Sequence, residues 1–278
     1  MLRRIITSVI LIPVLIYVIY ADFLNSILLL CFVLALSYLG SKELYNLLKK
    51  IYGIEDSGFA VLWSHIPGLA LLLTSYINVF FKSHSMGILY IIAGYMALVF
   101  IGTFAGFGMK SSGKYLLVFS ACYIYTSVFP LIIWVIRLEP QGYILIYFLF
   151  FLGWLNDALA YFIGTFLGRT RGLIKYSPNK SLEGYIGSFV LTIMIAAGLQ
   201  LALRPRLYLG FTESVAAGFL ISVFAPLGDL CESIVKRKAG AKDSSGFLPG
   251  LGGVLDVFDS ILLSVPFYYL LLKIFAVI

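Results

Sequence analysis

The stretch YILIYFLFFLGWLNDALAYFIGTFL, residues 143–167, decides the fold, because Asp157 is its only charged residue. In water, the aromatic and β-branched run Tyr143–Phe151 would favour a strand. A helix needs about 20 consecutive apolar residues to cross the hydrocarbon core of a bilayer. Backbone polar groups in a bilayer must be hydrogen-bonded within their own segment, so we predict that 143–167 is a membrane-spanning helix.

The rest of the chain repeats this pattern. Further apolar segments of similar length lie at 5–21, 24–41, 59–81, 86–107, 115–136, 184–203, 208–232 and 260–278. The 278 residues are 61% hydrophobic and 12% charged, whereas soluble domains average about 45–50% apolar and about 25% charged residues. The sequence predicts an all-α, polytopic integral membrane protein with about nine transmembrane helices, and it excludes a water-soluble globular fold.

The basic residues predict the orientation. If the N-terminus is cytosolic, most of the 20 lysines and arginines fall in cytosolic segments, and Lys82, Arg137, Arg204 and Arg206 are the main exceptions. This distribution satisfies the positive-inside bias. We expect a multi-pass protein of the cell inner (plasma) membrane. Its net charge of +7 suits anionic lipid headgroups and nucleotide phosphates, and we expect no nucleic acid partner.

Polar residues concentrate in the second half of the chain. We expect residues 1–150 to form an N-terminal region of transmembrane helices, and 151–278 to form a C-terminal transmembrane region that carries the functional site. Within the second region, two glycine-containing loops lie at about 168–184 and 236–259. Both loops are cytosolic in the predicted orientation.

Carboxylates gather beside these two loops. Asp157, Asp229 and Glu232 sit inside apolar helices, where an ionisable residue is rare and is either functional or paired. Asp229 and Glu232 are three residues apart and share a helix face, and Asp256 and Asp259 repeat that spacing. Two carboxylates on one face suit a hard cation such as Mg²⁺. The alternative is that nearby lysines and arginines simply neutralise both pairs.

Cations, hydroxyls and glycines complete the pattern. The segments Gly168–Arg171 and Tyr176–Ser181 precede a helix that is expected to start near Glu183, and helix N-termini bind phosphate through their free N–H groups. Several glycines before the last helix allow close backbone approach to a ligand; they are Gly246, Gly250, Gly252 and Gly253. Together these features predict a site that holds a metal ion and a polyphosphate.

At these residues the chain resembles the phosphatidate cytidylyltransferases, or CDP-diacylglycerol synthases. The resemblance in the second loop runs through Ser233–Arg237, Lys242-Asp243, Ser245, Leu248-Pro249, Gly252-Gly253, Asp256 and Asp259. The resemblance in the first loop runs through Asp157, Ala160-Tyr161, Gly164, Gly168-Arg169, Ser177-Pro178, Lys180-Ser181, Glu183-Gly184 and Gly187. Together they cover most of 154–260, while the first half of the chain matches only as a set of spans.

The resemblance implies a CTP-dependent nucleotidyltransferase that transfers CMP from CTP to phosphatidate, with Mg²⁺ as cofactor. CTP, phosphatidate and membrane lipids are the implied partners, and the family also suggests a homodimer. The implied catalytic residues are Asp229, Lys236, Asp256 and Asp259. The implied substrate-binding residues are Lys180, Ser181, Arg237, Lys242, Asp243, Gly252, Gly253, Asp157 and Glu183. The implied metal ligands are Asp229, Glu232, Asp256 and Asp259.

Two positions depart from the family pattern. Leu251 stands where the family has a histidine before the paired glycines, and Val257 stands where it has an arginine. Both changes remove polar groups that could contact a triphosphate. The alternatives are therefore a CTP-dependent lipid-alcohol kinase, a related lipid cytidylyltransferase, or a catalytically impaired paralogue.

Overall fold

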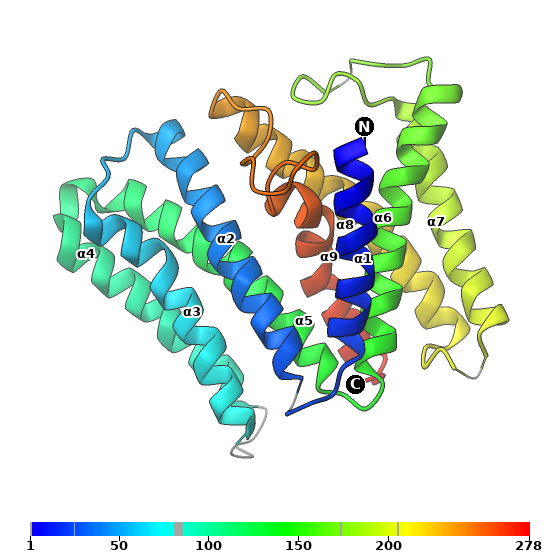
Figure 1. Ribbon diagram of the computed structural model, residues 1–278, viewed down its shortest axis with the longest axis horizontal. Coiled ribbons are helices and arrows are strands. Elements are labelled where there is room, and N and C mark those ends of the chain that lie inside the picture. The colour runs from blue at the N-terminus through cyan, green and yellow to red at the C-terminus, as the bar shows by residue number, and fades with distance from the viewer. Residues whose placement is uncertain (1, 25, 81–85, 173, 205) are drawn as a thin grey trace. The chain divides into compact units, whose positions relative to one another are not determined.

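The computed structural model describes residues 2–24, 26–80, 86–172, 174–204 and 206–278. The described residues form helices and no named strand. In chain order the helices are α1 (Leu2–Tyr20), α2 (Ile27–Tyr52), α3 (Gly58–Phe80), α4 (Met86–Tyr123), the π-helix η1 (Ile124–Val128), α5 (Phe129–Arg137), α6 (Gly142–Phe166), α7 (Leu182–Ala202), α8 (Phe211–Lys238) and α9 (Leu255–Ile274) (Figure 1).

These helices confirm the predicted all-α, polytopic membrane fold. Among the described residues, 8 helical segments are long and apolar enough to cross a bilayer, and a shorter apolar helix covers Ile6–Tyr20. Many large apolar side chains are exposed on them, including Tyr90, Phe166 and Ile274, with 73%, 79% and 79% of their surface accessible. A bilayer can cover such side chains, whereas water would not.

Several helices extend beyond their predicted bounds. α2 continues from the expected end at 41 to Tyr52, and α8 continues from 232 to Lys238. The last turns of α2 leave the apolar stretch but are rich in good helix formers such as Leu, Lys and Glu, and α8 ends on Lys and Arg, so both helices persist. α2 ends where Gly53 adopts a φ of 61° and donates its N–H to Lys49 O. The prediction that 236–238 belong to a loop was therefore wrong.

The break predicted between 107 and 115 falls inside α4, which is assigned as one helical element. The chain nevertheless folds back on itself there, because Tyr123 Oη donates to Ile92 O at 2.9 Å, whereas a straight helix would hold these residues about 46 Å apart. The two predicted spans are therefore separate, at Tyr90–Phe107 and Ser112–Arg137. Hydropathy placed a break there, since Lys110 and Lys114 interrupt the apolar run. Lys82, which the orientation argument counted outside, lies beyond the described residues.

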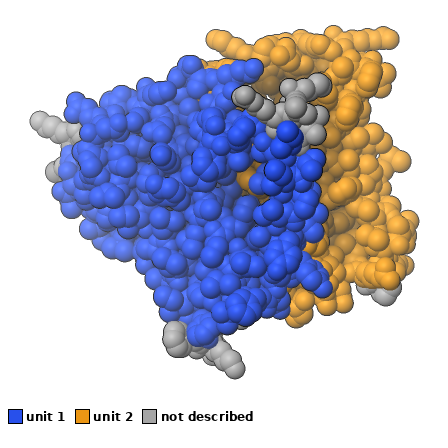
Figure 2. Space-filling model, in the orientation of Figure 1, with its two compact units in different colours: residues 1–134, 238–256 blue, residues 135–237, 257–278 orange. Residues whose placement is uncertain are grey.

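The chain forms two compact units, coloured separately in Figure 2. Unit 1 contains Met1–Trp134 and Lys238–Asp256, and unit 2 contains Val135–Arg237 and Val257–Ile278. In unit 1, α2, α3 and α4 pack on one another, and α2 is joined to η1 by the hydroxyls of Ser37 and Ser127 at 2.7 Å. The predicted division at residue 150 follows the location of the expected functional residues and not compactness. That division stays a prediction.

In unit 2, α6 and α7 pack on each other, and the buried apolar side chains come mainly from α6 and α9. Thr192 Oγ1 donates to Asn156 Oδ1 at 3.1 Å, which joins these two helices through buried polar groups. Tyr268 on α9 donates to Leu145 O at 3.2 Å. The end of α6, the start of α7 and the end of α8 lie at the same end of this unit (Figure 1), and that end carries the polar residues of the candidate site.

Candidate active site

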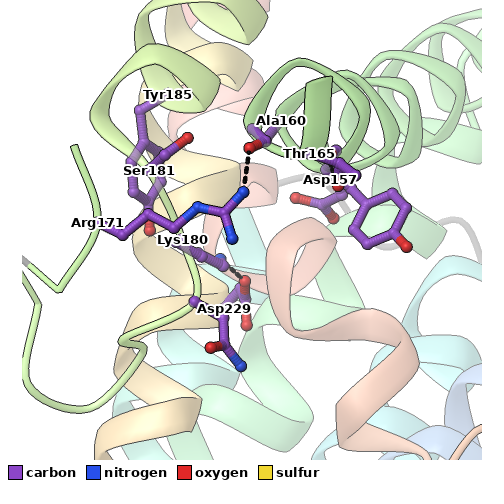
Figure 3. Close-up of a pocket in the computed structure, with 11 residues that line it drawn as sticks. Asp157, Ala160, Thr165, Arg171, Lys180, Ser181, Tyr185 and Asp229 are labelled. Atoms are coloured by element: carbon purple, nitrogen blue, oxygen red, sulfur yellow. Dashed lines mark hydrogen bonds and ion pairs between the residues drawn. The ribbon is translucent and has the colours of Figure 1, made fainter. Parts of the chain in front are cut away.

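A polar cavity of about 300 Å³ opens at this end of unit 2. α6, the following loop, the start of α7 and α8 all contribute to its wall. The lining residues are Asp157, Ala160, Tyr161, Gly164, Thr165, Arg171, Asn179, Lys180, Ser181, Tyr185 and Asp229 (Figure 3). Two cations and two acids therefore face one small space, which suits a charged ligand.

Lys180 is paired with Asp229 across this cavity (Figure 3). Their side chains are 30% and 26% exposed, so both remain open to a ligand. The ammonium also lies 5.5 Å from the centre of the Tyr185 ring. Burial lowers the pKa of Lys180, and the negative charges of Asp157 and Asp259 oppose that shift. A bound phosphate would add to these negative charges and favour the protonated lysine.

Glu183 holds the first loop in place. Its carboxyl accepts hydrogen bonds from Arg169 N and Thr170 N, each at 3.1 Å, and from Thr170 Oγ1 at 2.8 Å. Glu183 is absent from the lining of the cavity, so it acts here on the loop. Its predicted contact with substrate stays a prediction.

Arg171 reaches back from the same loop to α6, where Nη2 donates to Gly164 O at 3.0 Å. This bond leaves the guanidinium in the wall of the cavity (Figure 3). Ser181 caps α7, since its hydroxyl accepts from Gly184 N at 3.1 Å. A β-carbon at Gly164 would lie 2.9 Å from that hydroxyl, so a glycine is needed for α6 and α7 to approach this closely.

A second group of charges is buried deeper in unit 2. Glu232, Lys236 and Asp259 are only 4%, 8% and 6% exposed. Lys236 Nζ lies 3.0 Å from Glu232 Oε2, and Ser260 N donates to Asp259 Oδ1 at 2.6 Å. The carboxyl groups of Glu232 and Asp259 lie close enough to interact electrostatically. Two adjacent carboxylates repel each other unless a cation or a proton lies between them, and Lys236 supplies part of that compensation.

The predicted metal ligands are distributed over both units. Asp229, Glu232 and Asp259 belong to unit 2, while Asp256 belongs to unit 1. Within the described part of the chain, no group of three His, Cys, Asp or Glu residues could hold a metal ion. Mg²⁺ at phosphoryl-transfer sites usually takes only one or two carboxylates and completes its shell with water and substrate phosphates. The adjacent Glu232 and Asp259 carboxyls fit such a partial ligand set.

Asp256 is embedded in the second loop. Its Oδ2 accepts from Ser244 N and Ser244 Oγ, both at 2.8 Å, and from Gly253 N at 2.7 Å. Gly252 has a φ of 97°, and a β-carbon there would collide with the Asp256 carboxyl. The glycines therefore let the loop fold tightly around this acid. The predicted substrate contacts Arg237, Lys242 and Asp243 are exposed.

An apolar groove of about 680 Å³ lies between α7 and α8. Its lining is almost entirely hydrophobic and consists of Ile174, Leu182, Tyr185, Ile186, Phe189, Val190, Ser222, Val223, Pro226, Leu227 and Leu230. Tyr185 lines both this groove and the polar cavity. The two therefore meet at one side chain, an arrangement that fits a ligand with a charged head and a hydrocarbon tail.

Comparison with known proteins identifies the family. The model of the Cytidylyltransferase family matches residues 2–275, which is nearly the whole chain. The chain belongs to this family.

Several curated relatives carry the name phosphatidate cytidylyltransferase. The protein of Bacillus subtilis is 39% identical over 143 residues, which is 50% of this chain and 51% of the relative. That of Brucella abortus is 42% identical over 138 residues, or 50% of each chain. That of Haemophilus influenzae is 36% identical over 159 residues, or 52% of this chain and 54% of the relative. Each match therefore spans about half the length of the relative.

Seven residues in the wall of the cavity were not among the predicted site residues. They are Ala160, Tyr161, Gly164, Thr165, Arg171, Asn179 and Tyr185. An aromatic residue near a membrane surface is common at any lipid interface, so Tyr161 and Tyr185 gave no distinguishing signal. Asn179 could have been found, because it immediately precedes Lys180 in the first loop.

Proposed function

We propose that this chain is a phosphatidate cytidylyltransferase, which transfers CMP from CTP to phosphatidate and gives CDP-diacylglycerol and pyrophosphate in phospholipid biosynthesis. The observation that carries the proposal is the junction at Tyr185, where a cavity with two cations adjoins an apolar groove. A phospholipid offers the matching combination of phosphate head and acyl chains. Membership of the Cytidylyltransferase family and the names of the relatives support the nucleotide.

The reaction requires positioning and charge compensation more than a covalent intermediate. An oxygen of the phosphatidate phosphate forms a bond to the α-phosphorus of CTP, and the bond from that phosphorus to pyrophosphate breaks, so its electron pair leaves with pyrophosphate. A phosphomonoester has a second pKa of about 6 and is largely dianionic at pH 7, so no general base is obligatory. Lys180 and Arg171 would compensate charge on the phosphates, and Asp229 would hold Lys180 in place.

We propose Mg²⁺ as the cofactor, with Glu232, Asp259, Asp229 and Asp256 as candidate ligands. When bound, it would neutralise charge on the triphosphate and polarise the reacting phosphorus. We expect Asp259→Asn and Asp256→Asn each to abolish Mg²⁺-dependent turnover while the protein remains inserted in the membrane. Activity should also disappear with EDTA and return with Mg²⁺. Normal CTP turnover by both variants would exclude the metal assignment.

A pyrophosphate-release assay tests the function. Purified protein in liposomes, supplied with phosphatidate, CTP and Mg²⁺, should release one pyrophosphate for each lipid product, and omission of phosphatidate should stop the release. Release of CDP instead would favour a CTP-dependent lipid-alcohol kinase. A CTP-dependent product made only from a different lipid would favour a related lipid cytidylyltransferase.

The departures at Leu251 and Val257 define the remaining alternative, an impaired paralogue. Leu251 lies in the second loop, where its N–H bonds to Leu248 O at 3.0 Å. Val257 O accepts from Trp154 Nε1 at 3.2 Å, a bond that any side chain at 257 could keep. If these side chains limit the rate, Leu251→His combined with Val257→Arg should raise turnover. An unchanged rate would show that the site functions without them.

The finer location is also a proposal. The chain is a multi-pass membrane protein by its helices, and we propose the cell inner membrane with both loops and the N-terminus in the cytosol. The basic residues support this orientation, and CTP would be available on that side.

A further inference from the structure

Glu43 is a buried acid in a part of the chain that carries no recognised motif. It lies on α2 and is only 4% exposed. Its two carboxyl oxygens accept four hydrogen bonds, all from the second loop and the start of α9. Oε1 accepts from Ser245 Oγ at 2.6 Å and from Val254 N at 2.9 Å. Oε2 accepts from Ser244 Oγ and Leu255 N, both at 2.9 Å.

Two of these donors begin a helix. The first N–H groups of a helix have no partner within the helix and must be satisfied from outside. Val254 precedes α9 and Leu255 is its first residue, so Glu43 caps this helix from a distance of more than 200 residues along the chain. A buried carboxyl is costly unless it is hydrogen-bonded, and these four bonds offset that cost.

Ser244 connects Glu43 to Asp256. Its hydroxyl lies 2.9 Å from Glu43 Oε2 and 2.8 Å from Asp256 Oδ2. A serine hydroxyl has a single hydrogen to donate, so the two acids share one donor and movement of either carboxyl is felt by the other. A β-carbon at Gly253 would collide with both Ser244 Oγ and the Glu43 carboxyl, which leaves this position to glycine.

We propose that Glu43 is a positioning residue for the transfer reaction. Its carboxyl fixes the loop 239–254 and the first turn of α9, and thereby sets the place of Asp256. The inference rests on the proposed function, because Asp256 matters to the chemistry only if this site transfers a nucleotide. Glu43 itself contacts loop groups and is not a catalytic residue.

Glu43→Gln is the direct test. The amide has nearly the same shape, but it replaces one acceptor oxygen with an NH₂ group that faces hydrogen-bond donors. Val254 N and Leu255 N donate to Glu43 directly, and the Ser244 hydroxyl holds the amide of the same residue against Asp256. Weaker bonds at this carboxyl should therefore make amide exchange at all three residues about 10-fold faster. Because small displacements at a reacting centre can cost about 100-fold, kcat should fall between about 10- and 100-fold, with KM for CTP nearly unchanged.

Glu55→Gln is the matched control, because it removes the same charge from an exposed residue just beyond α2; its exchange and kcat should equal those of the wild type. Ser244→Ala removes the shared hydroxyl and keeps the bonds from Val254 and Leu255, so we expect an intermediate loss of kcat. This variant also tests the inference if Glu43→Gln fails to fold.

The two readouts separate this inference from the proposed function. If the three amides exchange at the wild-type rate in folded Glu43→Gln, Glu43 does not hold the loop and the inference is wrong. Faster exchange with an unchanged kcat would overturn the positioning role. If the wild type shows no nucleotide transfer at all, the proposed function fails, while the exchange measurement still decides whether Glu43 holds the loop.

Discussion

Lys180 is the residue on which the polar cavity depends most. It is the cation that pairs with Asp229 and lies over Tyr185. We expect Lys180→Gln to lower kcat/KM about 100-fold, the usual cost of removing one group that stabilises developing charge. Lys175→Gln, an exposed lysine of the same loop, should leave the rate unchanged. Equal effects of the two variants in the CTP assay would show that only general loop charge matters.

The pKa of Lys180 gives a second prediction. Burial lowers this pKa below the ordinary lysine value of 10.5. If the charged form is required, activity should fall as pH rises through the lowered pKa, before an ordinary lysine would deprotonate. Arginine stays protonated up to about pH 12, so Lys180→Arg should move the alkaline fall in kcat/KM to higher pH. If kcat/KM falls at the same alkaline pH in the wild type and in Lys180→Arg, another group is responsible for the fall.

Acids within apolar helices could be found from the sequence, because a charge in a membrane span must be functional or paired. Asp157 and Asp229 indeed line one cavity, and Glu232 is paired with Lys236. The residues that these acids contact across the fold could not be predicted from the sequence. Lys180 and Asp229 are 49 residues apart, and no pattern in a single sequence connects them.

At the scale of helices, the apolar runs predicted where the spans lie, but they predicted the ends of the helices less accurately. Hydropathy ends a span where charges begin, but hydrogen bonding carries α2 on to Tyr52. The predicted span ended at residue 41, so no feature of the sequence indicated Glu43, which is buried on α2. The same error placed Lys236 in a loop, whereas it is buried on α8.

The groove between α7 and α8 leads to a prediction about lipid binding. Ile186→Trp should fill part of the groove and raise KM for long-chain phosphatidate, with little change for CTP. The acyl chain would come from lipid rather than water, so only packing is lost, and we expect a rise of about fivefold. Met194→Trp on α7 is outside the groove lining and should have no effect. An equal rise for both variants would exclude the groove.

At the scale of the whole molecule, orientation can be measured directly. In a variant whose three cysteines are replaced by serine, Lys242→Cys should react with a membrane-impermeant maleimide in inverted vesicles and resist it in intact cells. Arg204→Cys, exposed in the segment between α7 and α8, should show the reverse. Labelling of both from the same side would contradict the predicted topology.

The central claim is that the cavity beside Lys180 transfers the α-phosphoryl group of a nucleotide to a lipid. CTP labelled at either the α- or the γ-phosphate, incubated with the protein, phosphatidate and Mg²⁺, tests it most directly. The account predicts α-label in the lipid and γ-label in pyrophosphate, with both signals strongly reduced in Lys180→Gln. γ-Label in the lipid, or no transfer from either position, would contradict it.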